Sequence, residues 1–169
     1  MIKTVIINIF RFILLIFLQF FLLNNLQFSG YVNPYLYILF ILWLPFETSG
    51  WLLLLVSFTL GLLIDVSSHT IGYHTMATVF TGYLRYHLLR FIAPRDGYDP
   101  GMSPTAPSLG WRWFLKYASL LVAAHHFLLF WLESFGWGDF ITASFRAVAS
   151  SVFTLALIII SQFLVAPSK

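Results

Sequence analysis

This chain of 169 residues is too apolar for a soluble domain, because 60% of its residues are hydrophobic and only 9% are charged, whereas a soluble domain carries roughly a quarter charged residues. With a mean hydropathy of +0.88, its outer surface must face lipid, so we expect an all-α integral membrane protein with a single domain over residues 1–169. The net charge of +3 comes without a basic, aromatic-rich soluble segment, so we expect no nucleic-acid partner, and the lack of cysteine excludes disulfides, thiolate metal sites and cysteine nucleophiles.

Six apolar runs follow one another along the chain, and a helix needs roughly 20 residues to cross the hydrocarbon of a bilayer. The runs cover residues 10–26, 34–46, 51–65, 72–92, 114–135 and 140–165. No small-x-small cleavage site follows the first run, so we interpret it as an uncleaved helix. The second and third runs are short and are separated by a turn-forming cluster at 45–50, so they form either two thin spans or a re-entrant hairpin.

The basic residues decide between these alternatives. Lys3 and Arg11 lie at the start of the first run, and a second basic group surrounds the Pro- and Gly-rich loop 93–110. That group consists of Arg85, Arg90, Arg95, Arg112 and Lys116. Basic residues mark cytoplasmic ends, so both regions lie on the same side and an even number of crossings separates them. We therefore predict a six-transmembrane-helix bundle in the cell inner membrane, with both termini and the 93–110 loop in the cytoplasm.

Ser57, Gly61 and Asp65 recur at four-residue spacing and share one face of the third predicted helix. Small residues on such a face allow another helix to approach closely. Asp65 ends this helix near the outer surface, and two interpretations are open. It either caps the turn to the fourth helix by accepting backbone N–H groups, or it forms a clasp with Arg146, the one basic residue predicted on that side, for which Glu133 is a competing partner.

Four of the five histidines lie in two close pairs in or near the predicted spans. His69 and His74 flank Gly72, but their spacing crosses a turn and no metal-binding motif is present, so we expect no metal and no cofactor. His125 and His126 are neighbours on one helix and point about 100° apart, so they cannot chelate as a pair. We interpret them as interhelical hydrogen-bonding groups, with a proton relay as the alternative.

Small residues also form stripes on the last two predicted helices. Ala143, Ala147 and Ser151 recur at four-residue spacing on the sixth helix, and Ser119 and Ala123 do so on the fifth. Such stripes are helix-packing faces, either within the bundle or toward a partner protein. The sequence leaves both uses open.

The sequence contains few residue patterns typical of a catalytic site. We find no serine in a nucleophile-elbow context, no paired carboxylates on one helix and no glycine-rich phosphate loop. We therefore expect no enzymatic activity, and an intramembrane enzyme built on His125, His126 or Asp65 is the least favoured class.

The stretch 33–99 resembles the rod shape-determining protein MreD family, in the form found in Bacteroidetes. The resemblance depends on Asn33-Pro34 before the second span, Gly61 followed by Asp65, and Gly72 ahead of the fourth helix. It covers about 40% of the chain, and the overall length and the six apolar runs agree with it. A phenylalanine-rich first helix and the Arg-Asp-Gly-Tyr segment of the loop are also similar.

The resemblance implies a non-enzymatic scaffold subunit of the complex that elongates the peptidoglycan wall and maintains cell shape. Its expected partner is the bitopic protein MreC, and further partners are MreB, RodA and a penicillin-binding transpeptidase, together with membrane lipid. The family is thought to share its fold with the substrate-binding S-components of energy-coupling-factor vitamin transporters. A vitamin-uptake subunit is therefore the alternative, although residues 2–26 lack the Ala-x-x-x-Ala docking face of such subunits and few polar residues are available to line a vitamin pocket.

Overall fold

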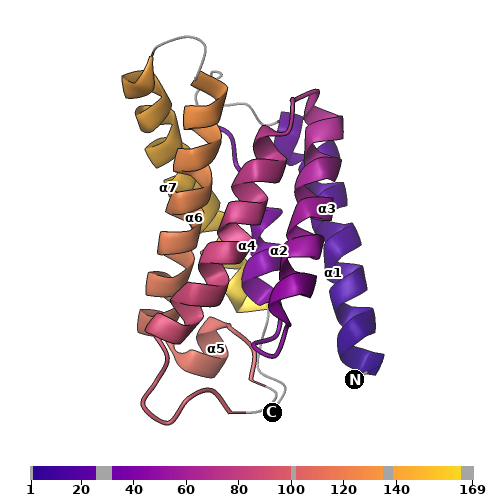
Figure 1. Cartoon of the computed structure of the whole chain (residues 1–169), viewed down its shortest axis with the longest axis vertical. Helices are drawn as coiled ribbons and strands as arrows, with labels where there is room; N and C mark the ends of the chain where they lie inside the picture. The colour runs from indigo at the N-terminus through magenta and orange to yellow at the C-terminus, as the bar shows by residue number, and fades with distance from the viewer. Residues whose placement is uncertain (1, 26–31, 100–101, 135–138, 165–169) are drawn as a thin grey trace.

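The computed structural model describes residues 2–25, 32–99, 102–134 and 139–164. Within these ranges the protein is a bundle of α-helices (Figure 1). The elements are α1 Ile2–Phe21, the 3-10 turn η1 Leu23–Asn25, α2 Ile38–Trp43, α3 Gly50–Ser68, α4 Tyr73–Phe91, α5 Ala106–Leu109, α6 Trp111–Ser134 and α7 Phe140–Leu164. Lys169 and the predicted span ends at 26, 135 and 165 lie outside the described residues.

The long helices run between the two ends of the bundle (Figure 1), α1, α3 and α6 in one direction and α4 and α7 in the other. The start of α1, the end of α4 and the start of α6 lie at the same end, which we call the loop end because residues 92–99 and α5 lie there. The far end of α7 also reaches it, since Gln162 Oε1 accepts a hydrogen bond from the Ala106 N–H at 3.2 Å. The turn from α3 to α4 lies at the opposite end, which we call the turn end.

Four helices in the described residues are long and apolar enough to cross a membrane. They are the segments Ile2–Asn25, Gly50–Ser68, Trp111–Ser134 and Phe140–Leu164. The chain is therefore built to be embedded in a membrane. α4 is as long as α3, at 19 residues each, but it carries Arg85, Arg90 and two histidines, which lower its hydropathy.

The second predicted span, 34–46, does not form one membrane-length helix. Its only helix is α2, which has six residues and is about 9 Å long. The side chains of Ile38 to Leu42 are between 0 and 5% exposed, so α2 is apolar on all sides and lies in the core, as a helix of that kind should. Pro45 accounts for the early end of α2, because the residue before a proline is disfavoured in the helical conformation and Leu44 has an extended ψ of 141°.

The non-helical backbone before α2 obtains its hydrogen bonds from side chains of distant helices. The Asn33 N–H donates to Ser150 Oγ at 3.0 Å, and the Tyr35 N–H donates to Thr154 Oγ1 at 3.1 Å. Gln19 Nε2 donates to the Pro34 carbonyl at 3.0 Å. Buried backbone groups without hydrogen-bond partners are costly in an apolar medium. Side chains of α1 and α7 supply these partners and so stabilise the extended segment.

Helix ends agree with the predicted runs to within a few residues for α3, α4, α6 and α7. The first helix begins at Ile2, eight residues before the predicted run 10–26, because the polar residues near the chain start do not interrupt helical geometry. The predicted loop 93–110 contains a short helix, α5. At the turn end, Asp139 caps α7: its Oδ1 accepts the Thr142 N–H at 3.0 Å, and hydrogen bonds from Thr142 hold the pKa of this carboxyl below its usual value.

Candidate functional site

The Asp65 carboxylate joins the end of α3 to the start of α4. Its Oδ1 accepts the His74 N–H at 3.0 Å and the Thr70 hydroxyl at 2.5 Å, and its Oδ2 accepts the Thr75 N–H at 2.8 Å and the Thr75 hydroxyl at 2.5 Å. The two N–H groups belong to the first turn of α4, which has no helical partners for them. Gly72, the N-cap residue, has no side chain with which to cap, so Asp65 takes that role across the turn. The capping interpretation is confirmed.

The backbone conformation at position 72 also requires glycine. Its φ of 89° lies in the left-handed region that glycine adopts without a steric penalty. His69, which ends α3, also has a positive φ of 55° and donates its N–H to the Asp65 carbonyl. The turn therefore reverses the chain through two left-handed residues around one carboxylate.

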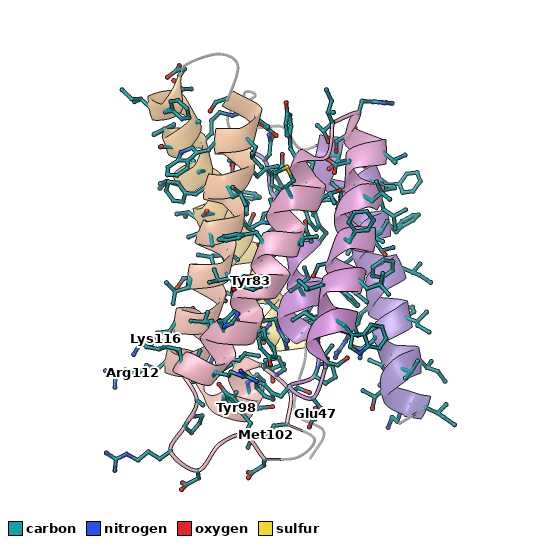
Figure 2. The ribbon with its side chains drawn as sticks, viewed as in Figure 1. Glu47, Tyr83, Tyr98, Met102, Arg112 and Lys116 are labelled. Carbon is teal, nitrogen blue, oxygen red and sulfur yellow. The ribbon has the colours of Figure 1, made fainter. Side chains whose placement is uncertain are left out.

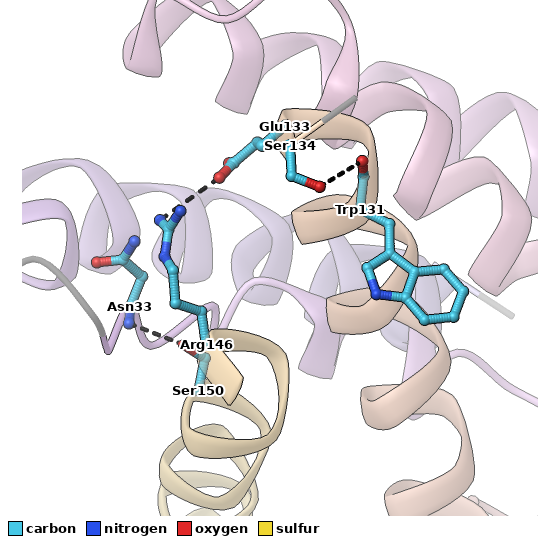
Figure 3. Close-up of polar contacts among 6 residues, drawn as sticks. All are labelled: Asn33, Trp131, Glu133, Ser134, Arg146 and Ser150. Carbon is cyan, nitrogen blue, oxygen red and sulfur yellow. Dashed lines mark hydrogen bonds and ion pairs between the residues drawn. The ribbon is translucent and has the colours of Figure 1, made fainter. Parts of the chain in front are cut away.

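The predicted Asp65–Arg146 clasp is wrong. Arg146 Nη2 lies 3.5 Å from Glu133 Oε2, and its guanidinium carbon lies 4.6 Å from the centroid of the Phe130 ring. Figure 3 shows Arg146 reaching toward Glu133. The reason is helix adjacency: α7 packs along α6, so the competing carboxylate on α6 is within reach, whereas Asp65 is already engaged at the start of α4.

Ser57 and Gly61 lie where α3 and α4 approach most closely. A Cβ added at Gly61 would lie 2.5 Å from Thr75 Cα and 2.9 Å from the His74 carbonyl oxygen, so only glycine fits. One turn further along, a Cβ at Gly82 would meet the Ser57 hydroxyl. The predicted small-residue face is therefore confirmed as an α3–α4 packing face.

Ala143 and Ala147 are 3% and 0% exposed, and Ser151 is 6% exposed. The stripe on α7 is therefore covered within the bundle, which answers the alternative that the sequence left open. Next to it, the His126 Nε2 lies 3.1 Å from Thr154 Oγ1, and His126 Nδ1 lies 2.8 Å from the Val122 carbonyl. This arrangement confirms His126 as an interhelical hydrogen-bonding group.

At the centre of the bundle, a buried tyrosine hydroxyl is hydrogen-bonded to two histidine rings. The Tyr37 hydroxyl lies 3.0 Å from His74 Nδ1 and 2.8 Å from His125 Nε2, and all three side chains are at most 1% exposed. His125 thus links α6 to α2, and His74 links α4 to the same tyrosine. Within the described residues no group of three or more His, Asp or Glu side chains is arranged to hold a metal ion.

A polar cavity of about 570 Å³ lies beside this chain, at the turn end. Most of its lining is hydrogen-bonding side chains. They are Gln19, Asn24, Asn25, Asn33, Tyr35, Ser67, Ser68, Thr70, His74 and Glu133. This lining differs from the expectation that few polar residues are available for such a pocket. The polar residues come from four separate segments of the chain, so their convergence is not visible in the sequence.

Arg85 was missed in a different way. It was counted as a cytoplasmic surface charge, but its side chain is 1% exposed. Its Nε donates to the Tyr117 hydroxyl at 2.9 Å and its Nη2 donates to the Leu44 carbonyl, while Tyr117 donates to the Leu42 carbonyl at 3.0 Å. Arg85 therefore donates hydrogen bonds to backbone carbonyls that have no helical partner where α2 ends near Pro45. Its position beside the basic loop concealed this role.

The chain was compared with models of known protein families, with curated proteins and with solved structures, and none of the three comparisons found a match.

Proposed function

We propose that this protein is a non-enzymatic scaffold subunit of a cell-wall elongation complex, similar to MreD, with a bitopic MreC-like protein as its main partner. The observation that carries the proposal is that Gly61, Asp65 and Gly72, the residues of the resemblance, form one physical unit. Gly61 permits contact between α3 and α4, Asp65 caps α4, and Gly72 turns the chain. A motif that fixes a helical hairpin suits a scaffold whose outer surface must keep a constant shape.

The proposed topology has six crossings with both termini in the cytoplasm. Four come from the long apolar helices, a fifth from α4, and the sixth from residues 32–43. The non-helical backbone of this last segment is hydrogen-bonded to the side chains of Gln19, Ser150 and Thr154. Lys3, Arg112 and Lys116 support the orientation, because the ends of α1 and α6 that carry them lie at the loop end (Figure 2). Arg146 belongs to the turn end.

Lipid-facing surfaces are available for a partner helix. On α3, the side chains of Leu55, Phe58 and Val66 are 54%, 49% and 68% exposed, and on α7 Phe145 and Val152 are 65% and 64% exposed. A transmembrane helix packs against such faces through van der Waals contact.

The test is co-purification of the tagged full-length chain with the MreC-like protein encoded in the same genome. We expect stoichiometric recovery from detergent, no recovery of an unrelated single-span protein, and weaker recovery with Asp65→Asn. Asp139→Asn, which changes a capping carboxylate at the same end on α7, is the matched control and should leave recovery unchanged. If wild type and Asp65→Asn recover equal amounts of the MreC-like protein, Asp65 has no role in partner binding. If wild type recovers none of it, the proposed function is wrong.

The alternative function, a substrate-binding subunit of a vitamin transporter, gains one observation. The 570 Å³ polar cavity falls in the range of small-molecule pockets. It predicts that freshly purified protein carries, or binds in a thermal-shift panel, a water-soluble vitamin. Asn33→Leu should abolish that binding, since Asn33 lines the cavity and its Oδ1 is buried without a hydrogen-bond partner among the described residues.

A further inference from the structure

A second cavity lies at the other end of the bundle, between α1 and the pair α2–α3. Its volume is about 950 Å³, and we call it the α1 groove. Near its N-terminal end α1 diverges from the rest of the bundle (Figure 1). Glu47 and Met102, which line the groove, mark its position at the loop end (Figure 2).

One face of α1 lines this groove with polar side chains. Thr4, Asn8 and Arg11 recur at i, i+4 and i+7, so they share a face, and all three line the groove. None of these three side chains forms a hydrogen bond or an ion pair with any of the described residues. The Arg11 guanidinium carbon lies 5.0 Å from the centroid of the Trp43 ring. Polar groups placed in a membrane without partners are costly, so this face calls for a polar occupant.

The polar face of α1 extends from Thr4 to Arg11. From Thr4 to Arg11 the helix rises about 10 Å, which is close to the depth of one headgroup region, roughly 5–8 Å. Farther along, the lining includes Phe12, Phe40 and Val56, and its one hydroxyl there, on Thr59, is already bonded to the Leu55 carbonyl. The groove is thus polar at its outer end and apolar toward the middle of the membrane.

We propose that the α1 groove binds one phospholipid molecule from the leaflet at the loop end. Its phosphate lies against Arg11, with Asn8 and Thr4 as further donors, and an acyl chain lies along the apolar part of the groove. Phosphate is the anion that the leaflet already presents at this depth, and guanidinium binds it through charge-assisted hydrogen bonds.

A transmembrane helix would be a poorer occupant. It would need an acidic side chain opposite Arg11, and placing that carboxylate in the membrane has a free-energy cost of its own. The inference needs only that the protein is embedded in a bilayer, so it does not depend on the function proposed above.

The experiment is native mass spectrometry of the full chain in detergent, titrated with dioleoyl phosphatidylglycerol or with dioleoylglycerol. The second lipid has the same chains without the phosphate. We expect saturable binding of one phosphatidylglycerol molecule and affinity for dioleoylglycerol about ten-fold weaker, the loss that one charge-assisted contact represents. Arg11→Gln should weaken phosphatidylglycerol binding by about the same factor. Arg112→Gln, an exposed cation at the same end outside the groove, should leave it unchanged.

A second pair of variants tests the apolar part without touching charge. Val56→Phe fills the groove and should abolish binding of both lipids, whereas Val152→Phe, on the exposed side of α7, should not change it. Equal affinities for the two lipids, equal effects of Arg11→Gln and Arg112→Gln, or non-saturable uptake that Val56→Phe does not alter would each overturn the proposal.

Discussion

At the scale of single residues, the protein uses polar side chains mainly to complete the backbone of other segments. Asp65 supplies acceptors to the first turn of α4, Gln19 serves Pro34 and Tyr37, and Arg85 serves the carbonyl of Leu44. In water these backbone groups would be solvated without help. In a bilayer they have no other source of hydrogen bonds, so each of these side chains carries a structural function that its residue type alone does not reveal.

Asp65→Asn keeps the size of the side chain but removes the charge and one set of acceptor sites. Two N–H groups and two hydroxyls then compete for a single amide oxygen. We expect a loss of about 1–3 kcal/mol in the free energy of unfolding, measured by thermal or denaturant unfolding in detergent. Asp139→Asn is the comparison, and an unfolding midpoint for Asp65→Asn that matches it would contradict this account of the turn.

Gln19→Leu tests the support of the extended segment before α2. Leucine fills the space but leaves the Pro34 carbonyl and the Tyr37 N–H without their partner. Because both groups are buried, we expect destabilisation of roughly 1–3 kcal/mol. Thr59→Val is the control: its hydroxyl bonds only to the Leu55 carbonyl on an exposed face, so its unfolding midpoint should be close to that of wild type. A neutral Gln19→Leu variant would mean that this segment is supported by other means.

At the scale of elements, the α3–α4 hairpin is the best-defined unit. Its helices approach closely at Gly61 and Gly82, and its turn is closed by Asp65. Small residues that let two backbones meet are the usual basis of helix association in membranes. The α6–α7 pair also packs along its length, and Ala143 and Ala147 of α7 are buried. The bundle therefore contains two hairpins, with α2 and the segment before it enclosed among the helices and α1 packed against α2 and α3.

Gly61→Ala should separate the two helices of the first hairpin. The added methyl group would lie 2.5 Å from a backbone atom, which cannot move without shifting α4, and overpacking of this kind costs about 1–3 kcal/mol. Gly50→Ala is the matched control, because its Cβ would meet only the Tyr86 ring at 3.8 Å. Unfolding of both variants in detergent measures the difference, and a Gly61→Ala variant as stable as Gly50→Ala would disprove the close contact.

Much of this arrangement was predictable from the sequence, and the exceptions have physical causes. Apolar runs located α3, α4, α6 and α7, and four-residue spacing located the Ser57–Gly61 face. Hydropathy cannot distinguish a helix from a buried extended segment, so the run 34–46 was read as one span. The partner of Arg146 depends on which helices are neighbours, and the spacing of residues along the chain does not contain that information.

At the scale of the whole molecule, cations gather at the loop end and the turn end has Arg146 in a pair with Glu133. This asymmetry predicts orientation in the membrane. Reporter fusions at residues 100 and 169 should both appear on the cytoplasmic face, and a fusion at residue 136 should appear on the other. Reporters at 100 and 169 on opposite faces would invalidate the six-crossing topology.

The hydrogen bonds between the segment before α2 and α7 also constrain biosynthesis. Asn33 and Tyr35 find their acceptors at Ser150 and Thr154, 117 and 119 residues later in the chain. When the ribosome has produced the first hairpin, those acceptors do not yet exist, so the early segment cannot enter lipid in its final form. It must stay hydrated, or shielded by the insertion machinery, until the last helix is synthesised. A nascent chain released before residue 150 would therefore be a substrate for membrane quality control, however apolar its completed helices are.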